Sequence, residues 1–166
     1  VLLCTKCYDN ECVLQRLGND LQVIPVQNGF DRTLSPRCSV EGIASYVSQC
    51  TPGQTSTRIT RGGDLHIGPS RPGQDTPLPT NVAGLVDVLE HHGAFRVRRV
   101  SNVLPFKYTK LMYNAAIGPL AAVTGFDNSQ LLTVPKARRI FFAFLRENHA
   151  ILSHARVELG TIGPFH

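Results

Sequence analysis

The sequence contains no hydrophobic run near the ~20 residues needed to cross a bilayer, and we expect no signal peptide in its first residues. Charged residues make up 17% of the chain and hydrophobic residues 42%, which excludes a highly charged, disordered tail. With 166 residues the chain can bury a core as one domain, or as one domain and part of another. We therefore expect a globular protein with no membrane partner.

Aromatic side chains are also few, at 7% of the residues. The net charge of +5 favours anionic partners such as a phosphorylated cofactor, a carboxylate substrate or nucleic acid. However, the basic residues from Arg58 to Lys110 are not interleaved with the aromatics that would stack on bases. We predict no nucleic-acid partner, which leaves a cofactor or a small carboxylate.

The cysteine and histidine patterns lack the partners that a disulfide framework or a metal site needs. Five cysteines are an odd number, so we expect free thiols in a reduced, cytoplasmic setting. Cys4-Thr-Lys-Cys7 has no second ligand pair for zinc, and its first cysteine ends an apolar run rather than starting a helix as in redox pairs. His149 and His154 lack the acidic residue of a metalloprotease helix. No metal site is predicted.

The first 26 residues predict a strand, a short helix and a second strand. Val1 to Thr5 is a continuous apolar run, Asp9 or Asn10 can cap a helix that Gly18 ends, and a second apolar run covers 21–26. Such a unit has parallel strands and binds ligands at their carboxyl ends. Lys6 and the loop Gln27-Asn28-Gly29 follow those ends, so we expect them to contact a ligand together. The alternative for Asn28-Gly29 is an ordinary turn.

An antiparallel extension and a helix are predicted next. We expect strands near 41–49, 55–60 and 64–67, an irregular proline-rich loop over 69–79, a helix from Thr80 or Asn81 to Gly93, and a strand over 94–100. The fold class is therefore α/β.

The rest of the chain is helical. One helix is predicted over 104–123, broken or kinked at Gly118-Pro119, and a second over 137–155, while 160–166 is expected to be a loop without a partner element. We place a domain boundary near 100–103, which divides the chain into 1–101 and 102–166. Because the chain lacks an initiator methionine and opens like the middle of a strand, we expect a piece of a longer protein.

Lys110 and Asn114 are four residues apart in this first helix, so their side chains share one face. A cation and an amide beside apolar residues can bind a polarised oxygen. The alternative is a solvated face of an amphipathic helix.

Four short motifs follow one another along the chain: Val1-Leu-Leu-Cys-Thr-Lys6, Val26-Gln-Asn-Gly29, Leu65-His-Ile-Gly-Pro69 and Tyr108-Thr-Lys-Leu-Met-Tyr-Asn114. In this order they resemble the ketopantoate reductase family (2-dehydropantoate 2-reductase). The last motif is similar to the family's W-x-K-L-x-x-N helix. The resemblance implies the C-terminal part of a Rossmann-like NADP-binding domain over 1–101, then the start of an all-helical substrate or dimerisation domain over 102–166.

The resemblance also implies a function, the NADPH-dependent reduction of 2-dehydropantoate to pantoate in pantothenate and coenzyme A biosynthesis. Lys110 would be the general acid and Asn114 would bind the substrate. Lys6 would contact NADPH, and Asn28 would orient both cofactor and substrate. A homodimer stays open.

Three departures from the family pattern keep alternatives open. Gly118 stands where the family has a second asparagine, so another 2-oxo acid is an alternative substrate. Tyr108 stands where the family usually has tryptophan. No G-x-G-x-x-G loop occurs in these residues; the resemblance puts it before Val1 and the family's acidic substrate residue after His166. The other alternative is a truncated, non-catalytic relative.

Overall fold

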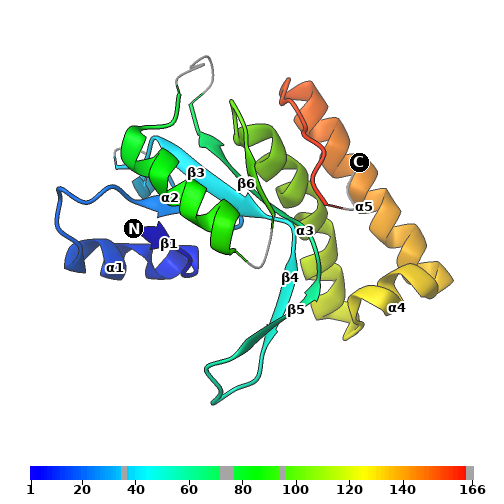
Figure 1. Cartoon of the computed structure of the whole chain (residues 1–166). Coiled ribbons are helices and arrows are strands. Elements are labelled where there is room, and N and C mark those ends of the chain that lie inside the picture. The colour runs from blue at the N-terminus through cyan, green and yellow to red at the C-terminus, as the bar shows by residue number, and fades with distance from the viewer. Residues whose placement is uncertain (35–36, 72–76, 94–95, 164–166) are drawn as a thin grey trace.

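The computed structural model describes residues 1–34, 37–71, 77–93 and 96–163 (Figure 1). Its first strands, β1 (Leu2–Leu3) and β2 (Ile24–Pro25), pair in parallel. Between them lie a short 3₁₀ turn, η1 (Cys7–Asp9), and helix α1 (Asn10–Arg16). The predicted strand–helix–strand unit is confirmed, and its two carboxyl ends lie next to each other.

Three longer strands form the centre of the sheet. Strand β6 (Asp64–Pro69) pairs antiparallel with β3 (Val40–Ala44) and parallel with β7 (Arg96–Arg99). A parallel bridge from Val26 to Gly42 joins β2 to β3. The strands therefore follow the order β1, β2, β3, β6, β7. A second 3₁₀ turn, η2 (Arg32–Leu34), precedes β3.

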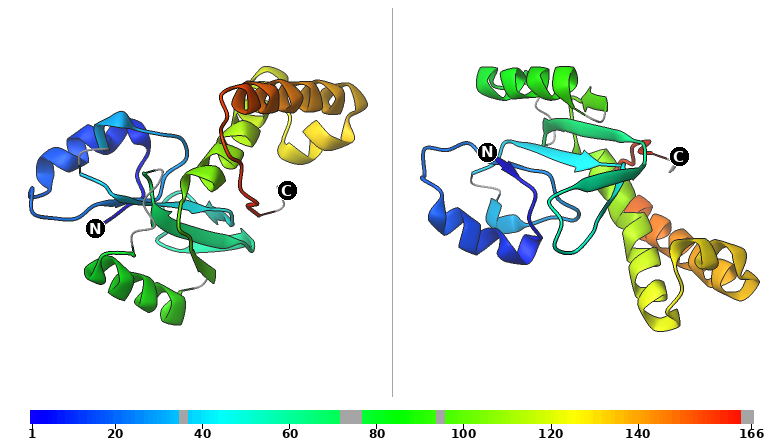
Figure 2. Two further views of the ribbon diagram at one scale, coloured as in Figure 1. Left: turned by 90° about the horizontal axis from the view of Figure 1, so that it is seen from above. Right: turned by 60° about the horizontal axis from the view of Figure 1, so that its bottom comes forward.

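Helices cover both faces of this sheet. Helix α2 (Thr80–His92) lies on one face, and α1 and α3 (Leu104–Thr124) lie on the other (Figure 2). Helix α2 confirms the helix predicted from Thr80 or Asn81 to Gly93, and its Val82 and Val86 are buried against the sheet.

The predicted single strand over 41–49 is wrong, because two strands occupy it. Strand β4 (Val47–Cys50) pairs with β5 (Thr57–Arg61) in a separate hairpin that projects from the sheet (Figure 1). The change of direction comes at Ser45. Its backbone N–H donates to the carbonyl oxygen of Asp64 at 2.8 Å, and its hydroxyl accepts a hydrogen bond from the Asp64 N–H at 2.8 Å. The Ser45 side chain therefore takes the place of a backbone carbonyl group at the end of β3.

Helices α3, α4 (Asn128–Thr133) and α5 (Pro135–His154) enclose a second core. The predicted second helix is confirmed by α5. Of the two predicted alternatives at Gly118-Pro119, a break or a kink, the break is wrong, because α3 continues through Pro119 to Thr124. Gly118 has no Cβ to meet the proline ring, and the exposed Ala115 leaves its carbonyl group open to water.

The predicted loop at the chain's end has a partner, contrary to expectation. Ile162 is fully buried with Ile43 and Val103. The Gly160 N–H donates to the Pro105 carbonyl at 3.1 Å, which fixes the segment along the start of α3. Residues 164–166 lie outside the described residues, as do 72–76 of the proline-rich loop and Ala94 and Phe95 of the last predicted strand.

Candidate active site

Lys110 reaches from α3 to the carboxyl end of β3. Its half-buried ammonium group donates a hydrogen bond to the carbonyl oxygen of Ala44. Burial, with a smaller contribution from the positive charge of Arg61, lowers the pKa of Lys110 to about 8. The side chain is therefore a cation at neutral pH that gives up its proton more readily than an exposed lysine.

A cavity of about 510 Å³ lies beside Lys110, between the β4–β5 hairpin and the three helices. Asn114 lines the same cavity, so the structure brings these two predicted site residues together. The other polar side chains include Arg61 and Asn128, and no aspartate or glutamate is among the lining residues. The rest of the lining is largely apolar: Ile117 comes from the same face of α3 as Lys110 and Asn114, and Leu131, Leu132, Phe141, Phe142 and Leu145 come from α4 and α5.

Lys6 and Asn28 form a second predicted pair, and they lie at the neighbouring ends of β1 and β2. Both are exposed, and the Cys7 thiol donates to the Asn28 carbonyl oxygen at 3.4 Å. Val26 forms a bridge with Gly42; Asn28 lies two residues after Val26, and Ala44 lies two residues after Gly42. The loop thus lies at the same edge of the sheet as the end of β3, although neither residue lines the Lys110 cavity.

A buried polar network below this loop was not predicted. Asn10, expected as a helix cap, instead turns inward with 1% of its surface exposed, and α1 has no side-chain cap. Its amide donates to Asp31 at 2.6 Å, and the Gln27 amide donates to Asn10 at 2.7 Å and to the Thr5 carbonyl at 2.6 Å. Hydrogen bonds from Thr33 and Asn10 lower the pKa of Asp31. The network holds the ends of β1 and β2 in place.

Lys107, one turn before Lys110, was also missed. Its side chain is 2% exposed, pairs with Glu41 on β3, and lies 4.8 Å from the centroid of the Phe30 ring. Glu41 and Ala44 are three residues apart on β3, as Lys107 and Lys110 are on α3. Both lysines therefore attach α3 to the same strand. In the sequence, the only signal for this role was a charge within an otherwise apolar segment.

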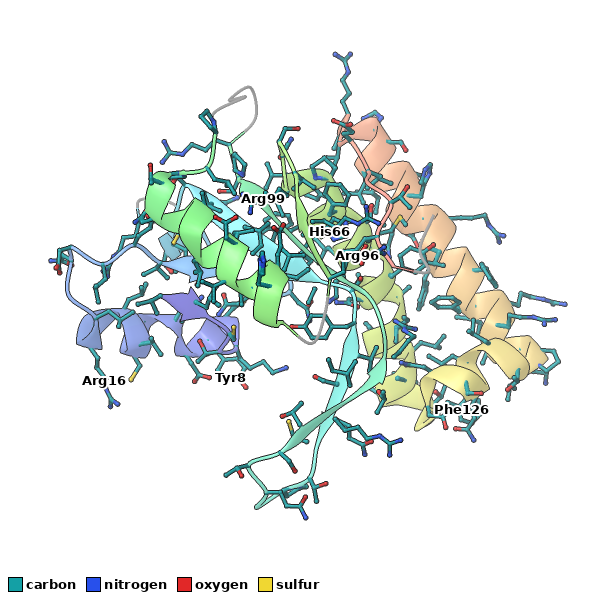
Figure 3. All side chains as sticks on the ribbon, in the orientation of Figure 1. Tyr8, Arg16, His66, Arg96, Arg99 and Phe126 are labelled. Atoms are coloured by element: carbon teal, nitrogen blue, oxygen red, sulfur yellow. The ribbon has the colours of Figure 1, made fainter. Side chains whose placement is uncertain are left out.

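A larger cavity, of about 750 Å³, lies on the other side of Ser45. His66, Arg96 and Arg99 gather near it (Figure 3). Asp64 pairs with Arg96 at 2.6 Å and with Arg98 at 2.9 Å, while Arg99 pairs with two carboxylates of α2. Because its positive charges are already compensated, this cavity is a weaker candidate than the one beside Lys110.

The cysteines and the possible metal ligands form no second candidate site in the part of the chain that the structure describes. All five cysteines are free thiols. Within the described residues, no three histidine, cysteine or acidic side chains gather as metal ligands. Each helix in that part of the chain is too short or too polar to serve as a membrane span.

Comparison with known proteins gives concordant matches. Residues 102–162 match the model of the family described as ketopantoate reductase PanE/ApbA C terminal. The 2-dehydropantoate 2-reductase of Pyrobaculum aerophilum is 33% identical over 70 residues, which are 42% of this chain and 25% of that protein.

Solved structures share the fold over nearly the whole chain. A PanE/ApbA family ketopantoate reductase from Ralstonia eutropha matches with a TM-score of 0.73 and 21% identity, over 97% of this chain and 53% of that one. A D-mandelate dehydrogenase in complex with NADH matches with a TM-score of 0.73 and 16% identity, over 95% and 54%. A dimeric ketopantoate reductase from Staphylococcus aureus matches with 0.71 and 14%, over 96% and 53%. The chain spans about half the length of these solved relatives, and the predicted fold class, a Rossmann-like part followed by helices, is confirmed.

Proposed function

We propose that the chain belongs to the ketopantoate reductase family, which its match over residues 102–162 and its likeness to a 2-dehydropantoate 2-reductase support, and that it supplies the proton donor and part of the cofactor site for reduction of a 2-oxo acid by NADPH. The family and the fold relatives support an oxidoreductase that uses a nicotinamide dinucleotide. More specifically, we propose that the substrate is 2-dehydropantoate, which would be reduced to pantoate in the biosynthesis of pantothenate and coenzyme A.

The observation that carries this proposal is Lys110 in its cavity. A general acid works best when its pKa is near the operating pH, and burial with the charge of Arg61 lowers the pKa of Lys110 to about 8. The protonated amine can give a proton to the C2 carbonyl oxygen of the substrate. A positioned donor of this kind stabilises a developing alkoxide by ~3 kcal/mol. Lys110 would then recover a proton from water.

The ends of β1 and β2 fit a nicotinamide dinucleotide, which supplies the hydride when bound. Lys6 presents an exposed cation suited to a phosphate group, and Asn28 lies on the sheet edge nearest Ala44, the partner of Lys110. In this proposal Lys6 holds the cofactor, and Asn28 orients cofactor and substrate. The pyrophosphate contacts are assigned to no residue of this chain, because it contains no G-x-G-x-x-G loop.

Asn114 is proposed to hydrogen-bond the polar end of the substrate from the same wall as Lys110. Gly118, one turn further, offers no second amide. This favours a second candidate, reduction of another 2-oxo acid, and the likeness to a D-mandelate dehydrogenase supports it. Comparison of kcat/KM for 2-dehydropantoate and for 2-oxo acids without its hydroxyl group separates the two.

The organisation of the whole protein belongs to the same proposal. Residues 1–101 would be the NADP-binding part and 102–166 the helical substrate or dimerisation part, in a cytoplasmic enzyme. The dimeric relative from Staphylococcus aureus supports a homodimer. A non-catalytic relative is the competing proposal, and a lack of thermal stabilisation by micromolar NADPH would support it.

Replacement of Lys110 tests the function directly. In the form of the protein that shows the reduction, Lys110→Ala should lower kcat by about 10²-fold or more, as expected for loss of a general acid. NADPH binding, followed by fluorescence, should be retained. Lys136→Ala, on the exposed start of α5, is the control and should leave kcat unchanged. Unaltered turnover in Lys110→Ala would refute the assignment.

A further inference from the structure

We propose that Arg61 binds the carboxylate of the 2-oxo acid and that the apolar lining from α4 and α5 receives an apolar side chain of that substrate. This inference rests on the second candidate of the proposed function, the reduction of a 2-oxo acid other than 2-dehydropantoate, because it concerns the same cavity. It assigns a specificity-determining residue on the β4–β5 hairpin, outside all four motifs of the sequence, and a substrate class.

The first step of the argument is the charge of the cavity. Arg61 and Lys110 are both among its lining residues, and no acidic residue is. Within the described part of the chain, the Arg61 guanidinium has no carboxylate partner. The arginines of the larger cavity differ, since Arg96 and Arg98 both pair with Asp64. The cavity beside Lys110 thus carries two uncompensated positive charges, which a bound anion would balance.

The second step is the position of the two cations. Lys110 is fixed by the carbonyl oxygen of Ala44 and reaches the cavity from α3, whereas Arg61 reaches it from β5. Both side chains line the same cavity, and the positive charge of Arg61 contributes to the lowered pKa of Lys110. A 2-oxo acid carries its carboxylate and its carbonyl group on adjacent carbons. The planar guanidinium matches a carboxylate through two parallel hydrogen bonds, which leaves Lys110 for the carbonyl oxygen.

The third step is the apolar lining that α4 and α5 contribute to the cavity. Leu131, Phe141 and Leu145 are buried there, while Leu132 and Phe142 line the same cavity although 48% and 46% of their surfaces are exposed. Apolar surface of this kind is stabilised when a ligand removes it from water. A substrate with a branched apolar side chain would therefore bind more favourably than one that ends in a hydroxyl group.

The probe that tests this is 3,3-dimethyl-2-oxobutanoate, which is 2-dehydropantoate without its hydroxyl group. Calorimetric titration of the 166-residue chain should show binding of this acid, with weaker binding of 2-dehydropantoate and of the neutral methyl ester. Arg61→Gln should weaken binding of the acid by about tenfold or more, as expected for loss of a charge-assisted contact. Arg58→Gln is the matched control, because Arg58 lies on the same strand, is exposed and does not line the cavity.

A second measurement does not depend on affinity. The pKa of Lys110, followed by NMR of its side chain, should rise in Arg61→Gln and stay unchanged in Arg58→Gln. The inference would be overturned if the acid did not bind, or if Arg61→Gln and Arg58→Gln weakened its binding equally. It would also be overturned if inorganic phosphate bound in the cavity as tightly as the acid. Binding that depends on Arg61, together with unaltered turnover in Lys110→Ala, would instead refute the proposed function alone. Reduction with an unaltered KM in Arg61→Gln would refute this inference alone.

Discussion

Burial acts on two basic side chains of this protein in the same direction, with different consequences. Removal from water disfavours the charged form, so the pKa values of both Lys110 and His66 are lowered. Lys110 keeps a hydrogen-bond partner and lines the cavity of the proposed active site, where its proton would be transferred to the substrate. His66 is 5% exposed, stacks on Phe106 with ring centroids 4.4 Å apart, and has no partner for Nδ1 among the described residues. Its titration therefore affects stability.

We expect His66 to make the free energy of unfolding fall as the pH is lowered through about 6.5. The unfolded chain takes up a proton there, while the folded state keeps a neutral imidazole because burial outweighs the charge of Asp64, and Arg98 and Arg96 oppose protonation as well. His66→Phe keeps the ring stack and should flatten this acid limb in urea titrations from pH 7.5 to 5. His149→Gln, on the exposed side of α5, should leave it in place. An unchanged limb in His66→Phe would contradict this explanation.

Residues of the candidate site were predictable to the extent that their role depends on near neighbours in the sequence. The four-residue spacing placed Lys110 and Asn114 on one face of a helix, and the structure puts both beside one cavity. Lys107 was not found, because its partner Glu41 lies 66 residues away on a strand whose position only the folded sheet fixes. Asn10 was misinterpreted for the same reason, since a turn asparagine and a buried one have the same local sequence.

At the scale of elements, the helices with a clear apolar stripe, α2 and α5, and the parallel pair β1 and β2 were predicted. Helix α4 was missed although it had a signal. Asp127 and Gln130 form a capping box, in which each side chain bonds the other's backbone N–H, at 2.8 and 2.9 Å. The division of 41–49 into two strands had no such signal, because it depends on the contact of Ser45 with Asp64 across the sheet.

Two glycines test how backbone conformation contributes to the helices. Gly84 lies inside α2 and Gly125 follows α3 with φ of 68°, and an added Cβ would meet no atom within 4 Å at either position. Gly84→Ala should raise the free energy of unfolding by about 0.5–1 kcal/mol, since alanine loses less chain entropy in a helix. Gly125→Ala should lower it by about 1–2 kcal/mol, because the left-handed conformation strains a Cβ. Urea titrations that gave both changes the same sign would contradict this reasoning.

At the scale of the whole molecule, α3 connects the sheet to the second helical core. Its first turns contact β3 through Lys107 and Lys110, while Met112, Ala116 and Leu120 pack against α4 and α5 (Figure 2). The proposed proton donor therefore lies where the two parts of the molecule meet. Its position depends on how firmly α3 is attached to β3.

The pair of Lys107 and Glu41 should provide most of that attachment. Lys107→Met leaves the Glu41 carboxylate without its cation, and we expect a loss of about 3 kcal/mol in the free energy of unfolding, at the low end for a buried pair because Glu41 is 19% exposed. Replacing both charges, in Lys107→Met with Glu41→Gln, should restore part of this loss, since no unpaired charge remains. Urea titrations of the two single variants and the double variant measure the coupling between them. If the two single losses simply add, the pair does not hold α3 on β3, and the position of Lys110 must depend on apolar packing instead.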